Sequence, residues 1–227
     1  MDSPESGPNA APIMTAPMIE RNLSAARSSG FLLIEVLVAL ALVLIGLLGL
    51  VGLQARVHQG EMEAYQRTQA LVLLRDMVDR IEAHRQAAPC FGDITTGSGT
   101  PYVGTGGTLP TFCNASGVVA TDQGALDAIT AWSDLVKGAG EVAGGNNVGA
   151  MIDGVGCVSL DLGPDAITPD RYTVAVAWQG LSDLPTASPA ADASAGENNA
   201  AACGTGLYGT AARRRIAWTT IDLAKLR

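Results

Sequence analysis

The chain has 227 residues and a formal net charge of -8, with 48% hydrophobic and only 16% charged residues. This length suits one moderate soluble domain together with a membrane segment. The acidic balance argues against a nucleic-acid groove, because phosphate binding depends on clustered Lys and Arg side chains. The basic run at residues 213–215 lies in a strand-like stretch and is interpreted as a solvated face or a charged sheet edge.

The first part of the chain passes from a polar stretch into a long apolar one. Residues 1–29 contain prolines and no apolar core, and Met14 and Met18 are alternative starts to Met1. The stretch from Phe31 to Leu53 would form a helix about 35 Å long, against about 30 Å for a bilayer core. It runs on into more helical sequence without a small-residue cleavage site, so we expect it to remain as a membrane anchor.

One charged residue, Glu35, interrupts this apolar stretch. A carboxylate inside a membrane helix costs about 2.5–3.5 kcal/mol on insertion scales, and more if it is isolated. We therefore expect Glu35 to find a positively charged partner. The alternative is that it lies near the lipid headgroups and stays hydrated.

The residues around Glu35, Gly30-Phe31-Leu32-Leu33-Ile34-Glu35, resemble the processing signal of type IV pilins and type II secretion pseudopilins. The resemblance implies that a prepilin peptidase removes residues 1–30 by cutting between Gly30 and Phe31, and that Phe31 becomes the N-methylated first residue. Leu32 departs from the usual Thr or Ser at its position. The resemblance also implies that Glu35 pairs with the terminal amine of a neighbouring subunit and so sets the register of assembly.

Later segments are similar to the PilV group of minor pilins. They are residues 36–54, 69–71, 74–81, 172–180 and 203–209. The resemblance implies an α+β type IV pilin fold, in which a long N-terminal helix packs on a small antiparallel β-sheet with long loops. Its parts would be a leader (1–30), a transmembrane helix (31–53), an amphipathic continuation of that helix (54–88) and a globular domain (89–227).

The location and partners follow from the same resemblance. The precursor would cross the inner membrane once, with its C-terminal domain in the periplasm, and would then move to a pilus on the cell surface. The implied partners are other minor pilins, the major pilin, the prepilin peptidase, the inner-membrane assembly platform and membrane lipid. We expect no nucleic acid, no cofactor and no metal.

The helix that begins at Phe31 can extend to Ala88, because no proline occurs before Pro89. Its second half is amphipathic, and we expect one face to lie against the sheet. The residues predicted on that face are Leu71, Leu74, Val78 and Ile81. Three glycines, Gly46, Gly49 and Gly52, indicate either close helix packing or local melting, or are ordinary residues of a membrane helix.

The globular part is predicted to contain a short helix and three strands. The helix spans Ala125 to Lys137, with Asp122 as its cap, Gly138 as its stop, and an inward face. That face consists of Leu126, Ile129, Trp132 and Val136. The segments from Cys90 to Gly124 and from Pro185 to Ala202 are predicted loops.

The three strands are predicted from alternating apolar residues. The first row is Val158, Leu160 and Leu162, and the second is Tyr172, Val174, Val176 and Trp178. A third strand begins with Ile216 and Trp218 and continues to Ile221 and Leu223 through a bulge.

The four cysteines lie beyond the apolar segment and form no CxxC pair, which argues against zinc and for two disulfides in an oxidising compartment. Three connectivities are possible. In an antiparallel meander the start of the first strand lies beside the end of the second, so we expect Cys157 to pair with Cys203. Cys90 then pairs with Cys113 and closes the loop that leaves the long helix.

No constellation in the sequence predicts an enzyme. His58 and His84 lie on the long helix without ligands at metal spacing, and Asp161, Asp165 and Asp170 bracket a turn rather than an EF-hand loop. The chain also lacks a nucleophile elbow, a phosphate loop and a dinucleotide fingerprint.

Four functions remain open at this point. The first is a minor pilin that initiates pilus formation at or near the tip and supports twitching motility and adhesion. The second is a tip adhesin that presents residues 95–109 or 184–202, and the third is a minor pseudopilin of a type II secretion system. An uncleaved membrane-anchored enzyme is the fourth.

Overall fold

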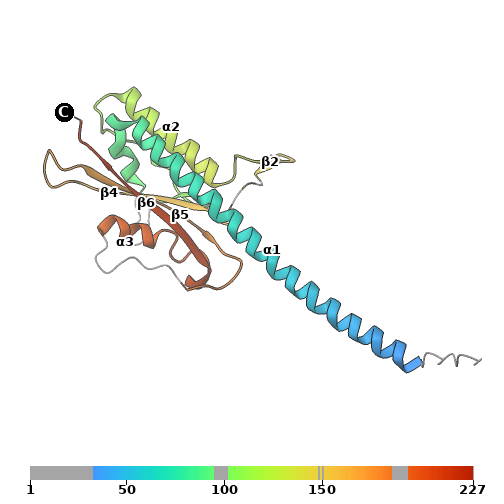
Figure 1. Ribbon diagram of the computed structural model, residues 1–227. Coiled ribbons are helices and arrows are strands. Elements are labelled where there is room, and N and C mark those ends of the chain that lie inside the picture. Colours follow the sequence, from blue (N-terminus) through green and yellow to red (C-terminus); the bar gives the residue numbers. More distant parts are fainter. Residues whose placement is uncertain (1–32, 95–101, 148, 150, 186–193, 227) are drawn as a thin grey trace, which may run out of the picture. The chain divides into compact units, whose positions relative to one another are not determined.

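The computed structural model describes residues 33–94, 102–147, 149, 151–185 and 194–226. The chain divides into two compact units, Met1–Leu50 and Val51–Arg227. The fold is α+β, with a long N-terminal helix that packs on a small antiparallel sheet through its later residues (Figure 1). In chain order the elements are α1 (Leu33–Ala83), η1 (Arg85–Asp93), β1 (Val103–Gly104), α2 (Val119–Val136), β2 (Val142–Ala143), β3 (Asn146–Asn147), β4 (Val155–Asp161), β5 (Asp170–Gln179), α3 (Ala195–Ala202), η2 (Ala211–Arg213) and β6 (Arg214–Leu223).

The packed face of α1 differs in part from the predicted one. Leu74 and Ile81 are buried as expected and Val78 is partly buried, but Leu71 is 49% exposed. The buried stripe has the spacing of one helical face. It consists of Gln66, Ala70, Leu73, Leu74, Met77 and Ile81.

The α-helix ends earlier than predicted. It stops at Ala83, and the following residues form the 3₁₀ segment η1, which contains Pro89. Ala87 has non-helical backbone angles and is fully buried, as is Phe91. Burial of these two side chains in the core draws the chain out of α-helical geometry before the proline is reached.

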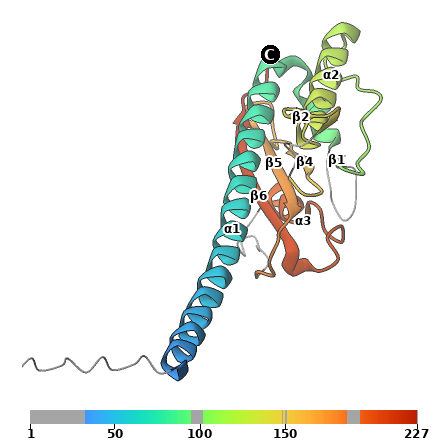
Figure 2. The ribbon, with the colours of Figure 1, turned by 90° about the vertical axis from the view of Figure 1, so that its right-hand side faces the viewer.

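The main sheet has the strand order β1-β4-β5-β6, and each neighbouring pair is antiparallel. Helices α1 and α2 lie on one side of it and α3 on the other, as Figures 1 and 2 show. The central strand β5 is therefore buried on both faces from Tyr172 to Trp178. The predicted second row of apolar residues is confirmed: all four of its side chains belong to the core shared with α1 and α2.

The predicted bulge in the last strand is absent. The register between β5 and β6 is constant from the pair Asp170–Leu223 to the pair Gln179–Arg214. As a result Ile216 packs against the α3 core and Ile221 against the α1–α2 core, on opposite faces of the sheet. In β4, Val158 is buried as predicted, whereas Leu162 lies beyond the strand and is 70% exposed.

A second, small core lies between α3 and the sheet. Helix α3 itself falls in the segment that is predicted from the sequence to be a loop. The helix begins with a capping box: Glu197 N donates to Ser194 Oγ at 3.2 Å, and Ser194 N donates to Glu197 Oε2 at 2.8 Å. Its small side chains allow a close approach to the sheet, since a Cβ on Gly196 would lie 2.7 Å from Asp161 and Thr173 side-chain oxygens. Residues 186–193 of the predicted loop lie outside the described residues.

Both predicted disulfides are present. Cys90 in η1 is bonded to Cys113, and Cys157 in β4 is bonded to Cys203 at the end of α3, with Cα–Cα distances of 5.6 and 6.0 Å. The bridges close loops with sequence separations of 23 and 46 residues. In the chain-entropy model, bridges of these lengths each add about 3–4 kcal/mol.

Trp132 of α2 connects the long helix to the sheet. Its side chain is fully buried and its Nε1 donates a hydrogen bond to Leu73 O of α1 at 2.9 Å. The inward face predicted for α2 is confirmed at all four positions, although the helix starts at Val119 rather than Ala125. Gly156 of β4 provides room for the ring, because a Cβ at this position would lie 2.1 Å from Trp132 Cη2.

Gly156→Ala is therefore expected to destabilise the protein. The added methyl group clashes with the fully buried ring of Trp132, and overpacking of this kind costs about 1–3 kcal/mol. Thermal unfolding of the full-length protein in detergent micelles, followed by near-ultraviolet circular dichroism, measures the change.

Gly124→Ala is the matched control. Gly124 lies inside α2, and the nearest atom to an added Cβ is 3.7 Å away, on His84. This change should leave stability unaltered or raise it by up to about 1 kcal/mol, because Ala favours a helix over Gly. Equal stability losses in the two variants would contradict the assigned position of Trp132.

Candidate functional site

The first part of α1 presents a continuous apolar surface. Between Leu33 and Leu53 the large apolar side chains have exposed fractions from 46% to 84%. Among the described helices, α1 is the one long and apolar enough to cross a membrane. A surface of this size is unfavourable in water, so its natural surroundings are lipid or the apolar faces of other helices.

Glu35 lies in the first turn of α1 and is exposed within the chain. A carboxylate is favourable at this position because the N-terminal end of a helix carries a partial positive charge. The helix itself thus offsets part of the cost of placing Glu35 among apolar side chains. Gly30 and Phe31, the predicted cleavage and methylation residues, lie outside the described residues.

The three glycines of the apolar segment pack against none of the residues that the structure describes. α1 is continuously helical through Gly46, Gly49 and Gly52, and a Cβ at any of them would meet no atom of the described residues within 4 Å. The described helix shows no local melting at these residues. Two explanations for the glycines remain: close approach of a helix from another molecule, or the ordinary occurrence of glycine in membrane helices.

The packed part of α1 starts with a polar network around Glu63. Glu63 Oε1 accepts hydrogen bonds from Leu181 N at 3.1 Å, Ser182 N at 3.1 Å and Ser182 Oγ at 2.8 Å. Arg215 of β6 completes the network with an ion pair of 3.2 Å. The two side chains are only 23% and 13% exposed, so the charges are largely shielded from water.

This environment lowers the pKa of Glu63 below its ordinary value. Burial raises the pKa, but the hydrogen bonds from Ser182 and the charge of Arg215 together lower it by more. The native state therefore holds Glu63 ionised more firmly than the unfolded state does.

On its other side, α1 is held through Tyr65. Tyr65 OH donates to Glu141 Oε1 at 3.3 Å, just before β2, and accepts from Gln69 Nε2 at 3.0 Å. Within the second compact unit, Glu63 and Tyr65 thus join α1 to residues 181–182 after β5, to Arg215 in β6 and to Glu141 before β2. The sequence offered no signal for the pairing of Glu63 with Arg215, because the two residues are 152 positions apart.

The basic run at residues 213–215 is only in part the solvated face that was predicted: Arg213 is 49% exposed, whereas Arg214 and Arg215 are partly buried. Arg214 donates to the carbonyl oxygens of Ala201 and Cys203 and thereby caps the C-terminal end of α3. Burial lowers the pKa of Arg214. Arg215 is committed to Glu63 and Ser182, and Arg213 forms an ion pair with Asp183 at 3.2 Å.

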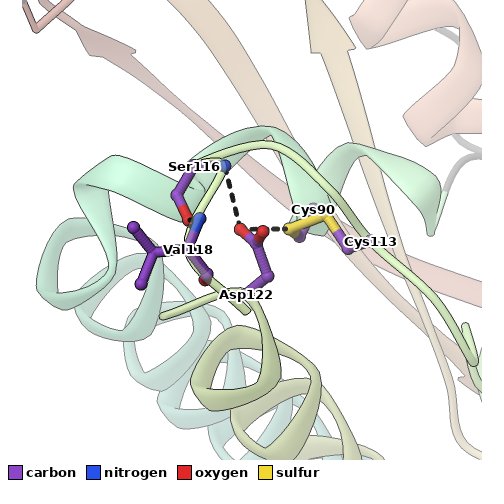
Figure 3. The surroundings of a disulfide bond; sticks show 5 residues. All are labelled: Cys90, Cys113, Ser116, Val118 and Asp122. Atoms are coloured by element: carbon purple, nitrogen blue, oxygen red, sulfur yellow. Dashed lines mark hydrogen bonds between the residues drawn. A yellow bond between two sulfur atoms is a disulfide. The ribbon is translucent and has the colours of Figure 1, made fainter. Parts of the chain in front are cut away.

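Asp122 is not the N-cap that was predicted. It lies in the first turn of α2, is 3% exposed, and accepts a hydrogen bond from Ser116 N at 2.9 Å (Figure 3). Its Oδ1 lies 3.9 Å from Cys90 Sγ. Because Cys90 and Cys113 are joined, neither sulfur has a proton to donate or a thiolate to bind a metal, so the cluster serves to fix the loop before α2.

The histidines and the turn aspartates form no common site in the described part of the chain. His58 is exposed, as predicted, but His84 is half-buried with its Nδ1 2.9 Å from Arg80 O. Asp165 accepts hydrogen bonds from Ile167 N and Thr168 N, which is the turn chemistry expected for it. The described residues contain one cluster of potential metal ligands, the disulfide and Asp122.

Comparison with known proteins assigns the chain to no family. No family model, no curated protein and no solved structure matches the chain.

Glu63→Gln is expected to reduce stability by about 1–3 kcal/mol at pH 7, since the buried network loses a charged acceptor. The folded state lowers the pKa of Glu63, so its contribution is complete above the ordinary value of 4.5 and disappears as the pH falls through the native pKa. Thermal unfolding of the wild type and of Glu63→Gln between pH 7 and pH 3 should show that the stability difference between them becomes smaller as the pH falls.

Glu61→Gln is the control for this experiment. Glu61 is 66% exposed and faces only His58 on the same helix, so its replacement should change stability by less than about 0.5 kcal/mol. A Glu63→Gln deficit that stays constant down to pH 3 would contradict the assigned ion pair.

Proposed function

We propose that the protein is a minor subunit of a type IV pilus, of the kind represented by the PilV group, and that it takes part in initiating the filament. The observation that carries the proposal is the exposed apolar segment of α1, with Glu35 in its first turn. The same helix continues into the core of a small α+β domain.

The physical basis is the unsatisfied chemistry of this segment. Its side chains are exposed among the described residues, and insertion in a bilayer leaves the Glu35 carboxylate in need of a positive charge. After cleavage at Gly30, the amine of Phe31 on an adjacent subunit supplies that charge. Because an ion pair in an apolar medium tolerates little displacement, it fixes the axial offset between subunits.

The domain that follows suits an oxidising compartment. Its two disulfides join η1 to the loop before α2 and β4 to the end of α3. On this proposal the apolar segment crosses the inner membrane with the disulfide-bonded domain in the periplasm. Assembly then extracts the helix from lipid into the filament and carries the domain to the cell surface.

Glu35→Gln tests the role of the carboxylate. The variant should insert in the membrane and form both disulfides like the wild type, while its amount in sheared filaments falls at least about tenfold, as expected for the loss of one buried ion pair. Immunoblots of membranes and of sheared filaments provide the two readouts.

Glu61→Gln is again the control, because Glu61 lies on the same helix beyond the apolar segment and is exposed. It should enter filaments at the wild-type level. Normal incorporation of the Glu35→Gln protein would remove the proposed function of that residue.

Deletion of the gene distinguishes the related assemblies. Loss of surface pili and of twitching motility supports the pilus subunit, whereas a block in protein export with intact motility identifies a type II secretion pseudopilin. A strain that keeps pili but loses adhesion points to a tip adhesin. No change in any of these properties contradicts the proposal.

A further inference from the structure

Among the described strands, none pairs with the outer edge of β6. β6 is the last strand of the sheet, and its ladder with β5 extends one residue further through a hydrogen bond from Gly180 N to Arg213 O at 2.7 Å. In an antiparallel ladder the backbone groups of successive residues point alternately to the two sides. Arg213 faces β5, so the odd-numbered residues of β6 bond to β5 and the even-numbered residues point away from the sheet.

The bonds on the other side of β5 agree with this assignment. Gln179 N donates to Ile152 O at 2.9 Å, on the side of β4, so the odd-numbered residues of β5 face β4. Its even-numbered residues therefore face β6. The register, in which Val174 lies opposite Thr219 and Val176 opposite Ala217, pairs them with the odd-numbered residues of β6.

The described chain closes only the two ends of this edge. Arg214 N donates to Ala211 O at one end, and Ala224 O accepts from the Arg85 guanidinium at the other. Between them, the outward N–H and C=O groups have no hydrogen-bond partner among the described residues. They belong to Ile216, Trp218, Thr220 and Asp222.

The edge also lacks the usual features that prevent strand pairing. From Ile216 to Ile221 it contains no charge, no proline and no glycine, and its constant register leaves no bulge. The charged residues that flank it are directed elsewhere: Arg214 to the end of α3, and Asp222 to Arg171 at 2.8 Å. By contrast, β1 and Ile94 O cover part of the outer edge of β4.

We propose that the outer edge of β6 binds an extended strand of another polypeptide, which adds to the sheet beside β6. Only an extended backbone offers alternating donors and acceptors that match this row of groups. The side chains beside the row, Ile216, Trp218 and Thr220, favour a partner strand with β-branched or aromatic residues.

Charge argues for a different polypeptide rather than a second copy. Each chain carries a net charge of -8, so two copies repel one another, and a neutral or basic strand is favoured. The inference goes beyond the pilus proposal and does not depend on it, because it uses residues of the sheet and none of the apolar segment.

A synthetic peptide with the sequence of residues 171–179 serves as the probe. This β5 sequence already pairs with the inner edge of β6, and it carries one basic residue and no acidic one. Fluorescence anisotropy with full-length protein in detergent micelles should show binding with a Kd below about 1 mM. The same peptide with N-methyl groups on alternate amides cannot form the ladder and should not bind.

Thr220→Pro is the variant that tests the edge. It removes an outward N–H that bonds to nothing described, and proline is tolerated on the free side of an edge strand. The melting temperature should stay within about 3 °C of the wild type, while affinity for the peptide falls at least about tenfold.

Thr219→Pro is the matched counterpart, since it removes an N–H that faces Val174 of β5. Thr219→Pro should lower the melting temperature strongly. The contrast with Thr220→Pro distinguishes residues whose N–H bonds to β5 from residues whose N–H points away from the sheet.

Hydrogen exchange gives an independent readout. The amides of Ile216, Trp218 and Thr220 should exchange quickly in the free protein and slowly with the peptide bound. Absence of peptide binding to the wild type, or equal binding to Thr220→Pro, overturns the proposal. A wild-type dimer in sedimentation that Thr220→Pro dissolves also overturns it, because the occupant would then be a second copy.

Discussion

A single helix has to remain stable in two different surroundings, and the rest of the molecule depends on this constraint. Up to Met62 every described residue of α1 is exposed within the chain. From Gln66 onward, one face of the helix is buried in the core of the domain. Tertiary packing stabilises most helices in water, but the apolar segment has no such packing against the described residues. It is long and apolar enough to cross a membrane, a medium in which backbone groups must bond to one another and exposed apolar side chains carry no penalty.

The sheet domain shows how the packed end of this helix is held. Trp132 fills the space between α1 and β4 and bonds to a carbonyl of the helix, while Gly156 leaves room for its ring. Glu63 and Tyr65 add polar attachments where the packed stripe begins. The aromatic core is small, with aromatic residues making up 4% of the chain, so the two disulfides contribute a substantial share of the stability.

The features that follow from local patterns were predictable from the sequence. The apolar segment, the inward face of α2 and the apolar row from Tyr172 to Trp178 in β5 depend on helical or strand periodicity, and all three are present. The disulfide pairs followed from the order of the strands. The capping box of α3 was also visible, as Ser194 followed three residues later by Glu197, but its alanine-rich surroundings were interpreted as a loop.

Other features depended on contacts between distant residues. The early end of α1 results from burial of Ala87 and Phe91, and the partial burial of Arg214 and Arg215 depends on acceptors in α3 and α1. The free edge of β6 emerges only once the strand order and the direction of each backbone bond are known. No local pattern carries this information.

The central claim is that the chain enters a filament through a processed N-terminus that begins at Phe31. Mass spectrometry of the intact protein from sheared surface filaments tests it most directly. The account predicts a chain that starts with N-methylated Phe31 and is lighter by four hydrogen atoms because of its two disulfides. A filament protein that still carries residues 1–30, or a protein confined to the membrane fraction, would contradict it.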